Sequence, residues 1–459
     1  MQPTPSGSRS SRSPRRVAFW TNLSRYVAAL LLVAIGAAAF AVMFRHAASF
    51  VFERLYHERD VLTAFESLPL YARLLLPPLG GALAGLCGHF AARIKSGQGV
   101  GEVMEAIVLG TTRVSLRLTL LKALGSFFAL TFGGSVGREG PLIQFGGGLG
   151  GNLGRWFGLR ETQVRGLIAA GTAAGFAAAY NTPFAAVLFV LEVVTGVMAL
   201  DVVLPAIIAT PLATALTRLA IGGGPIYGLR SFGMRSDWEL LAHALLGLLA
   251  GVCGPLFMIL LARGESWFAG LPGPRPLRAA VGGLIVGAVA LGFPQITGNG
   301  YEAINRILDG KLALGLLLAL LVSKAVATTA SVSSGSPGGV FTPSLFLGAA
   351  LGGAFGDGLA RLPLHASLGA SEAFALVGMA AMTAATTHAP VMAAALVFEL
   401  SGDYSIVLPL LIATALSTLL SRRLHPISIY GEELQRRGIG WEMTLAGRRM
   451  HNSHSDDDA

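Results

Sequence analysis

The stretch Gly134-Ser135-Val136-Gly137-Arg138-Glu139-Gly140-Pro141 lies between two apolar segments and places an arginine and a glutamate side by side among glycines. Glycine destabilises a helix interior and lets other groups approach the backbone closely. Pro141, which lacks an N–H, suits the first turn of a helix. A helix N-terminus is therefore expected here, with bare N–H groups and the positive end of the helix dipole, which together favour an anion. Gly137 and Arg138 are candidate anion-binding residues.

The composition predicts an all-α polytopic membrane protein whose surroundings are the lipid bilayer. Of 459 residues, 53% are hydrophobic and 13% are charged, whereas soluble domains average roughly 25% charged residues. Apolar stretches, most of them near bilayer length, recur from about Tyr26 to Leu420. Because a carboxylate inside a bilayer is costly and marks function, Glu139 is predicted to occupy the anion site when charged and to leave it when protonated.

The net charge of +9 is concentrated at the two ends of the chain. Residues 1–24 are expected to form a basic, disordered cytoplasmic tail, and residues 423–459 a short second tail. Positive charge that flanks membrane spans marks the cytoplasmic side, so both termini are predicted to lie on the cytoplasmic side of the plasma (inner) membrane. No nucleic-acid partner is expected, because no folded domain accompanies this charge. Cys87 and Cys253 support neither a disulfide framework nor a metal site, and no cofactor is expected.

The chain repeats itself, which indicates two related membrane halves. Residues 137–141 (GREGP) match residues 339–343 (GVFTP), and residues 181–192 match residues 388–399. Segments interrupted by glycine and proline at matching places in two halves indicate a transport site near the bilayer midplane. The predicted division is a first membrane repeat over 25–221, a connecting loop over 222–237 and a second repeat over 238–422. An odd number of membrane crossings in each half would invert one half relative to the other.

These motifs resemble those of the CLC family of chloride channels and chloride/proton antiporters. Residues 137–141 stand as that family's GREGP motif, and residues 339–343 are similar to its GIFAP motif. The resemblance covers nearly the whole chain, from about Tyr26 to Tyr430. It is greatest to short bacterial members of the ClcB type, which are usually described as voltage-gated chloride channels. No pair of cytoplasmic CBS domains is expected after the membrane part.

The resemblance implies a fold, a substrate and a set of site residues. The fold would be two inverted repeats of tilted and broken helices, assembled as a homodimer in which each subunit holds its own pore. Chloride would be the transported anion. Glu139 would be the gating glutamate, the N–H groups of Val340 and Phe341 would bind the central anion, and Tyr430 would donate its hydroxyl to the same ion.

Two positions depart from the family pattern. The family's GSGIP motif appears here as GQGVG over residues 97–101, so Gln98 replaces the anion-binding serine. A glutamine amide still donates hydrogen bonds, and Gln98 stays a candidate anion ligand with altered selectivity. In proton-coupled members an internal glutamate follows the position of Glu192. Val193 takes that place here. This favours a channel, with a chloride/proton antiporter that uses the same pore as the alternative and Glu192 as its candidate proton residue.

Other interpretations stay open at several residues. Glu192 and Glu399 occupy equivalent repeat positions, which favours a shared structural use such as helix capping or interhelical hydrogen bonding. Tyr430 beside a basic tail is typical of an interfacial anchor. An intramembrane hydrolase would use Ser336 as nucleophile and His388 as base, but residue type alone supports it, so an enzyme is not expected. His388 fits a cap at a helix start.

Overall fold

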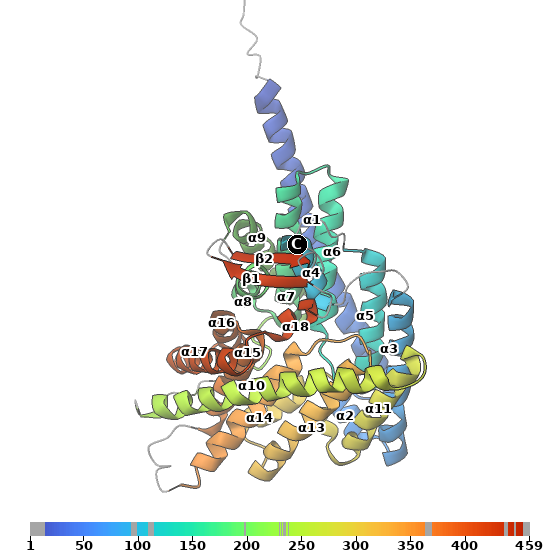
Figure 1. Ribbon diagram of the computed structural model, residues 1–459, viewed down its shortest axis with the longest axis vertical. Coiled ribbons are helices and arrows are strands. Elements are labelled where there is room, and N and C mark those ends of the chain that lie inside the picture. Colours follow the sequence, from blue (N-terminus) through green and yellow to red (C-terminus); the bar gives the residue numbers. More distant parts are fainter. Residues whose placement is uncertain are drawn as a thin grey trace, which may run out of the picture.

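The computed structural model describes residues 14–452 except 93–98, 109–113, 197–198, 229, 231, 233–235, 237, 363–369, 436–438 and 445–446. Within this part of the chain, seven helical stretches are long and apolar enough to cross a membrane. The chain is an integral membrane protein, and its membrane part is all-α. Helix α1 extends along the long axis of the molecule, and α10 runs crosswise to it (Figure 1).

The elements of the two halves follow one another in a matching order. The first half contains α1 (Pro14–Val51), η1 (Phe52–Tyr56), α2 (Val61–Ser67), α3 (Leu70–Ala92), α4 (Gly99–Val108), α5 (Leu116–Thr131), α6 (Glu139–Trp156), α7 (Glu161–Tyr180), α8 (Pro183–Leu188), η2 (Phe189–Thr195) and α9 (Leu200–Ile221). The second contains α10 (Glu239–Gly270), α11 (Arg275–Gly292), η3 (Pro294–Ile296), α12 (Tyr301–Leu308), α13 (Leu314–Ser333), α14 (Phe341–Leu359), α15 (Ser371–Thr387), α16 (Pro390–Ser401) and α17 (Val407–Leu424). The chain continues with α18 (Ile429–Gln435), β1 (Ile439–Thr444) and β2 (Gly447–Asn452).

Glycines bring equivalent helix pairs together in both halves. In the first half, α6 packs on α7 so closely that a Cβ on Gly146 would collide with the carbonyl of Gly171. In the second half, α14 packs on α15 and a Cβ on Gly348 would collide with the carbonyl of Gly378. Small residues allow membrane helices to approach in this way. Each repeat therefore holds its motif-bearing helix rigidly against the next helix of the same half.

The two ends of the chain differ from the expectation. Helix α1 begins at Pro14, so residues 14–24 are helical and the prediction of a disordered tail over 1–24 is wrong for them. Residues 1–13 lie outside the described part. In the predicted second tail, β1 and β2 pair antiparallel, with Ile439 opposite Asn452, and the hairpin lies against α18 and α4. The six residues of β2, GRRMHN, lack the alternation of polar and apolar residues that would predict a strand.

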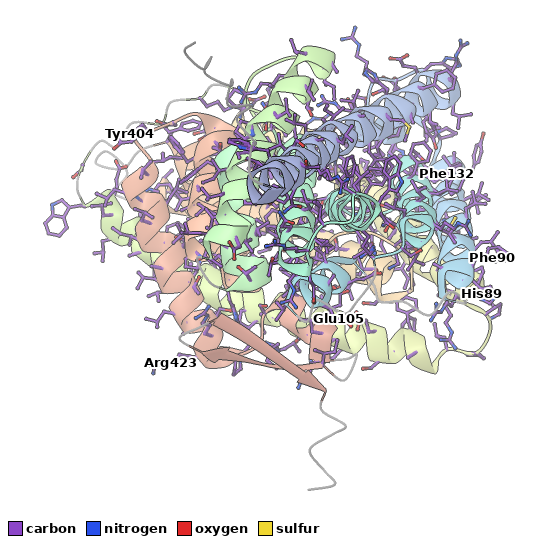
Figure 2. All side chains as sticks on the ribbon, turned by 90° about the horizontal axis from the view of Figure 1, so that it is seen from above. His89, Phe90, Glu105, Phe132, Tyr404 and Arg423 are labelled. Carbon is purple, nitrogen blue, oxygen red and sulfur yellow. The ribbon has the colours of Figure 1, made fainter. Side chains whose placement is uncertain are left out.

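The basic end of α17 shares a side of the molecule with this hairpin. Figure 2 shows Arg423 and Glu105 toward the hairpin and Tyr404, just before α17, on the opposite side. Helix α9 ends at Ile221 and α10 begins at Glu239. The division into 25–221, 222–237, 238–422 and 423–459 stays a prediction.

Candidate functional site

The two repeated motifs meet at their first glycines. The N–H of Gly137 donates to the carbonyl of Gly339 at 2.8 Å, and the N–H of Gly339 donates to the carbonyl of Gly137 at 2.9 Å. This isolated bridge is antiparallel, as an inverted pair of halves requires. It brings the N-termini of α6 and α14 to one place. Because its N–H is already bonded, Gly137 does not offer that donor to an anion, which corrects the expectation for this residue.

The Glu139 carboxylate lies at the start of the helix from the other half. Its Oε1 accepts hydrogen bonds from the N–H groups of Phe341 and Thr342, both at 3.1 Å, and its Oε2 accepts one from the Thr342 hydroxyl at 2.9 Å. The side chain is 2% exposed. Bare N–H groups and the helix dipole stabilise negative charge at this end of α14. The carboxylate therefore stands where the backbone would hold a small anion.

The glycines of the bridge provide the space for this carboxylate. A Cβ on Gly137 would collide with both carboxylate oxygens of Glu139, and a Cβ on Gly339 with Oε1 and Cδ of the same side chain. Any larger residue at either position would force the side chain away from α14. The contribution of Gly137 is therefore room and backbone pairing.

The other predicted ligands on these motifs have distinct surroundings. Val340 precedes α14 as its N-cap, and its N–H donates to no acceptor in the described part of the chain. Arg138 is the N-cap of α6, and its guanidinium lies over the Tyr301 ring, 5.2 Å from the centroid, a favourable cation–π geometry. Arg138 thus places positive charge one residue before the gate candidate. Gln98 lies outside the described residues.

Tyr430 is joined to the same site through aromatic rings. It lies on α18 with 6% exposure, and its ring packs edge-on against Phe189, with centroids 6.1 Å apart. Phe189 in turn packs edge-on against Phe341 at 6.4 Å. An interfacial anchor would be exposed, so the burial of Tyr430 does not fit that interpretation. The ring of Phe341 belongs to this cluster while its N–H faces Glu139.

Glu192 and Glu399 exchange contacts between the halves. Glu192 accepts hydrogen bonds from the N–H groups of Val391 (3.3 Å) and Met392 (2.7 Å) at the start of α16. Glu399 accepts from Phe184 (3.0 Å) and Ala185 (2.7 Å) at the start of α8. Each carboxylate caps the helix of the other half, which matches the shared structural use that their repeat positions indicate. Both oxygens of Glu192 accept N–H groups, as the oxygens of an ionised carboxylate can.

His388 ends a helix, so the expected cap at a helix start is wrong. It is the C-cap of α15, with φ 58°, and Asn181 ends α7 in the same way with φ 61°. The His388 ring contacts the Ser421 hydroxyl at 3.4 Å, and its carbonyl accepts from Arg422 at 3.0 Å. Within the described contacts, Ser336 is not its partner. This arrangement gives no support to a hydrolase that uses these two side chains.

Two lysines at matching repeat positions are buried in different ways. Lys122 on α5 pairs with the Glu102 carboxylate at 3.3 Å. Lys324 on α13 donates to the carbonyls of Ile296 (2.8 Å) and Gly298 (3.0 Å). Glu102 offsets the charge of Lys122, whereas Lys324 is held by backbone carbonyls and lies over the Phe346 ring, 5.1 Å from its centroid.

Two further residues of the site, Thr342 and Tyr180, carry little signal in the sequence. The Thr342 hydroxyl, besides its bond to Glu139, lies 2.8 Å from the Tyr180 hydroxyl on α7. The sequence signal for Thr342 is its place in GVFTP, where the similar family motif GIFAP has alanine. Nothing in the sequence near Tyr180 connected it to the second half.

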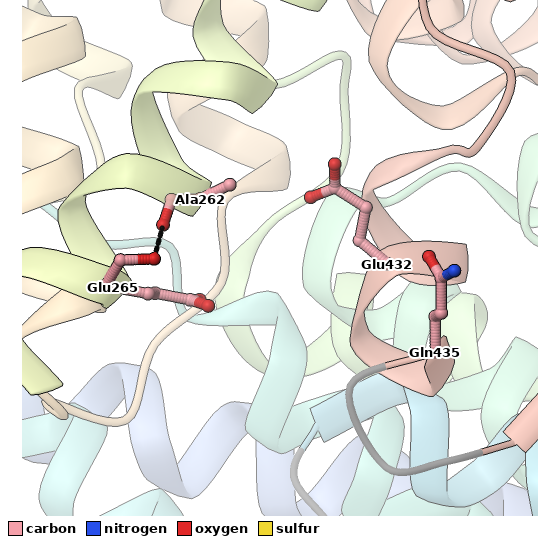
Figure 3. A pocket seen from close by; sticks show the side chains of 5 residues that line it. Ala262, Glu265, Glu432 and Gln435 are labelled. Carbon is pink, nitrogen blue, oxygen red and sulfur yellow. Dashed lines mark hydrogen bonds between the residues drawn. The ribbon is translucent and has the colours of Figure 1, made fainter.

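A separate opening lies between α10 and α18. Its volume is about 250 Å³, and it is lined by Ala262, Glu265, Ser266, Glu432 and Gln435. Figure 3 shows Glu265 and Glu432 on its two sides. Two carboxylates at one opening disfavour an anion. The site at the start of α14 is therefore the better candidate for anion binding.

The chain is similar to known membrane proteins over most of its length. Residues 80–422 match the family described as voltage gated chloride channel. A ClcB-like chloride channel protein of Ralstonia nicotianae is 39% identical, over 83% of this chain and 89% of the relative. The voltage-gated ClC-type chloride channel ClcB of Escherichia coli O81 is 36% identical, over 86% of this chain and 95% of the relative.

Solved structures agree with the architecture. The crystal structure of a slow cyanobacterial Cl⁻/H⁺ antiporter matches with a TM-score of 0.81 and 26% identity, over 90% of this chain and 98% of that one. A CLC-type fluoride/proton antiporter matches with a TM-score of 0.73 and 24% identity, over 91% and 98%, a likeness that shows the fold alone. The predicted fold of inverted repeats with broken helices is confirmed.

Proposed function

Since this chain belongs to the voltage-gated chloride channel (CLC) family, we propose that it is a transmembrane chloride channel whose pore is gated by Glu139. One observation carries this proposal. The Glu139 carboxylate accepts hydrogen bonds from the N–H groups of Phe341 and Thr342, which begin α14 in the other half of the chain. A charged carboxylate and a chloride ion compete for the same donors.

Protonation of Glu139 is the opening step of this mechanism. A neutral carboxyl group gains less from N–H donors at a helix N-terminus than a carboxylate does, so it leaves and an anion enters. Partial charges on N–H groups bind an anion weakly enough for release, which conduction requires. Low external pH is therefore expected to open the pore.

The remaining ligands are proposed along the same path. The N–H of Val340 and that of Phe341 would bind the central anion, with the Tyr430 hydroxyl and Gln98 as further ligands. Arg138 would attract anions toward the gate.

A chloride/proton antiporter is the second candidate, favoured by the likeness to the cyanobacterial antiporter. It needs an inner proton carrier. Val193 cannot carry a proton, and both carboxyl oxygens of Glu192 already accept N–H groups at the N-terminus of α16. These two residues favour the channel.

Flux from liposomes that contain the purified protein tests the proposal. Chloride efflux and proton uptake are recorded together, at several external pH values. We expect efflux that rises as external pH falls and no proton movement driven by a chloride gradient. Glu139→Ala should conduct at neutral pH without further response to acid. Glu161→Ala, which alters an exposed carboxylate in the first turn of α7, should behave as the unaltered protein. An unchanged pH response in Glu139→Ala would refute the gate assignment.

Location and assembly follow the same premise. We propose a plasma-membrane protein with both termini in the cytoplasm, since Arg422 and Arg423 end α17 on the side of the hairpin.

A homodimer is proposed from the family resemblance. Helix α9 and helix α17 carry exposed apolar residues, among them Ile207, Ile208 and Leu411, that a second copy could cover. Cross-linking in the membrane tests this.

A further inference from the structure

We propose that the Thr342 hydroxyl is a third donor of the anion site at the start of α14 and that Tyr180 orients it. The inference rests on the proposed function, because it assumes that an anion takes the place of the Glu139 carboxylate. Thr342 then adds a side-chain ligand to a site otherwise built from backbone N–H groups. Tyr180 acts through Thr342 and is a positioning residue.

The hydrogen bonds around Thr342 have one consistent direction. Its Oγ1 lies 2.9 Å from Glu139 Oε2 and 2.8 Å from the Tyr180 hydroxyl. An ionised carboxylate only accepts hydrogen bonds, and a threonine hydroxyl carries a single hydrogen. Thr342 therefore donates to Glu139, and Tyr180 donates to Thr342. Such a chain polarises the hydroxyl that faces the carboxylate.

This use of a threonine differs from the ordinary one in this protein. Many helix hydroxyls bond to the carbonyl one turn earlier, as Ser344 of the same helix does to Val340 at 2.9 Å and Thr387 of α15 does to Thr383 at 2.7 Å. The Thr342 hydroxyl instead points at the site, and its residue is fully buried. No helical hydrogen bond competes for it.

Tyr180 is fixed so that it can hold this geometry. Its ring lies 4.9 Å from the Phe176 ring and 5.6 Å from the Phe341 ring, between centroids, and the residue is fully buried. Tyr180 belongs to α7 of the first half, whereas Thr342 belongs to α14 of the second. The first half thus supplies both the gate and the residue that orients a ligand of the second half.

The consequence concerns which anions the site prefers. When Glu139 leaves, two N–H groups and one O–H converge on the entering ion. A hydrogen bond to a charged group changes affinity by roughly tenfold or more. A compact ion such as chloride gains more from a third donor than thiocyanate, whose charge is spread over a longer ion. Loss of the hydroxyl should therefore weaken chloride binding and favour thiocyanate in relative terms.

Chloride binding in the Glu139→Ala background isolates the ligand role from the gating role. Isothermal titration calorimetry with chloride, then with thiocyanate, is carried out on purified protein in detergent. Adding Thr342→Val should weaken chloride binding about tenfold and thiocyanate binding less. Thr342→Ser, which keeps the hydroxyl, should restore chloride affinity. Tyr180→Phe should weaken chloride binding by about threefold and add nothing once Thr342→Val is present.

The possible failures are distinguishable. If Glu139→Ala itself neither binds nor conducts chloride, the proposed function is wrong. If Glu139→Ala binds chloride and Thr342→Val binds it equally well, only the present inference is overturned. Equal losses in Thr342→Val and Thr342→Ser would assign the effect to packing and also overturn it. Should Thr342→Val fail to fold, an unchanged affinity in Tyr180→Phe, which removes one oxygen, overturns the role of Tyr180.

Discussion

Replacing Glu192 and Glu399 separately by glutamine should produce the same loss of stability and no loss of transport. The two carboxylates stand at matching repeat positions, and each caps the first turn of the helix from the other half. Glutamine keeps the shape of the side chain and one acceptor oxygen. It removes the negative charge and turns an –NH₂ group toward one backbone N–H.

The magnitude follows from these contacts. A charge at a helix N-terminus contributes up to about 2 kcal/mol in partly buried geometry, and a buried donor left without a partner costs about 1–3 kcal/mol. One N–H of each pair, that of Val391 and that of Phe184, belongs to an exposed residue and regains water. About 2 kcal/mol per variant is therefore expected. For a chain of this length, that corresponds to a fall of about 2 °C in melting temperature.

Two measurements on the purified variants check this. Circular dichroism at 222 nm follows thermal unfolding in detergent, and liposomes report chloride efflux with simultaneous proton recording. Glu192→Gln and Glu399→Gln should melt at the same lowered temperature and conduct chloride with the same pH response as the unaltered protein. Glu161→Gln, at the exposed start of α7, should melt near the unaltered temperature.

The reasoning is refuted in two ways. If Glu192→Gln alone changes proton movement or the pH response, Glu192 carries a proton and the repeat symmetry has misled the assignment. If neither variant lowers the melting temperature, the caps do not stabilise the fold.

Three further predictions concern the gate, the selectivity and the buried charges. Gly339→Ala should raise chloride efflux at neutral pH toward the level of Glu139→Ala, because its Cβ displaces the carboxylate; efflux that still requires acid would contradict this. Gln98→Ser should change the chloride-to-nitrate permeability ratio, and an identical ratio would remove Gln98 from the path. Lys122→Met should destabilise the protein by about 3–5 kcal/mol, because the buried Glu102 loses its oppositely charged partner and keeps the amide of Gln144, and adding Glu102→Gln should recover much of this in thermal melts.

The places where the helices break could be predicted from the sequence. Glycine and proline at 137–141 and at 339–343 mark the starts of α6 and α14, and the repeat indicated that these starts converge. The reason is local: residues with special backbone preferences fix a helix boundary wherever they occur.

The partner of the gate could not be predicted in the same way. The sequence places Glu139 at the start of its own helix, and the expectation assigned the anion site to that end. In the structure the carboxylate bonds Phe341 and Thr342 of α14, while the N–H of Gly137 pairs with Gly339. Which helix end a side chain reaches depends on how the halves pack, and a repeat pattern shows equivalence without showing contact.

The contacts between the two halves distinguish the acidic residues with a structural role from the one with a proposed functional role. Glu192 and Glu399 are repeat mates, and each caps the other half, so their contacts obey the two-fold relation. Glu139 has no such mate, since the matching residue in GVFTP is Phe341, whose N–H is a donor to that same carboxylate. Two acids at these matching positions would each accept hydrogen bonds from the start of the opposite helix, so that α6 and α14 would both be capped in the same way. In the proposed mechanism, Glu139 is the single titratable occupant of one set of donors, so a change of its protonation opens one anion site, while Glu192 and Glu399 cap helices across the two halves.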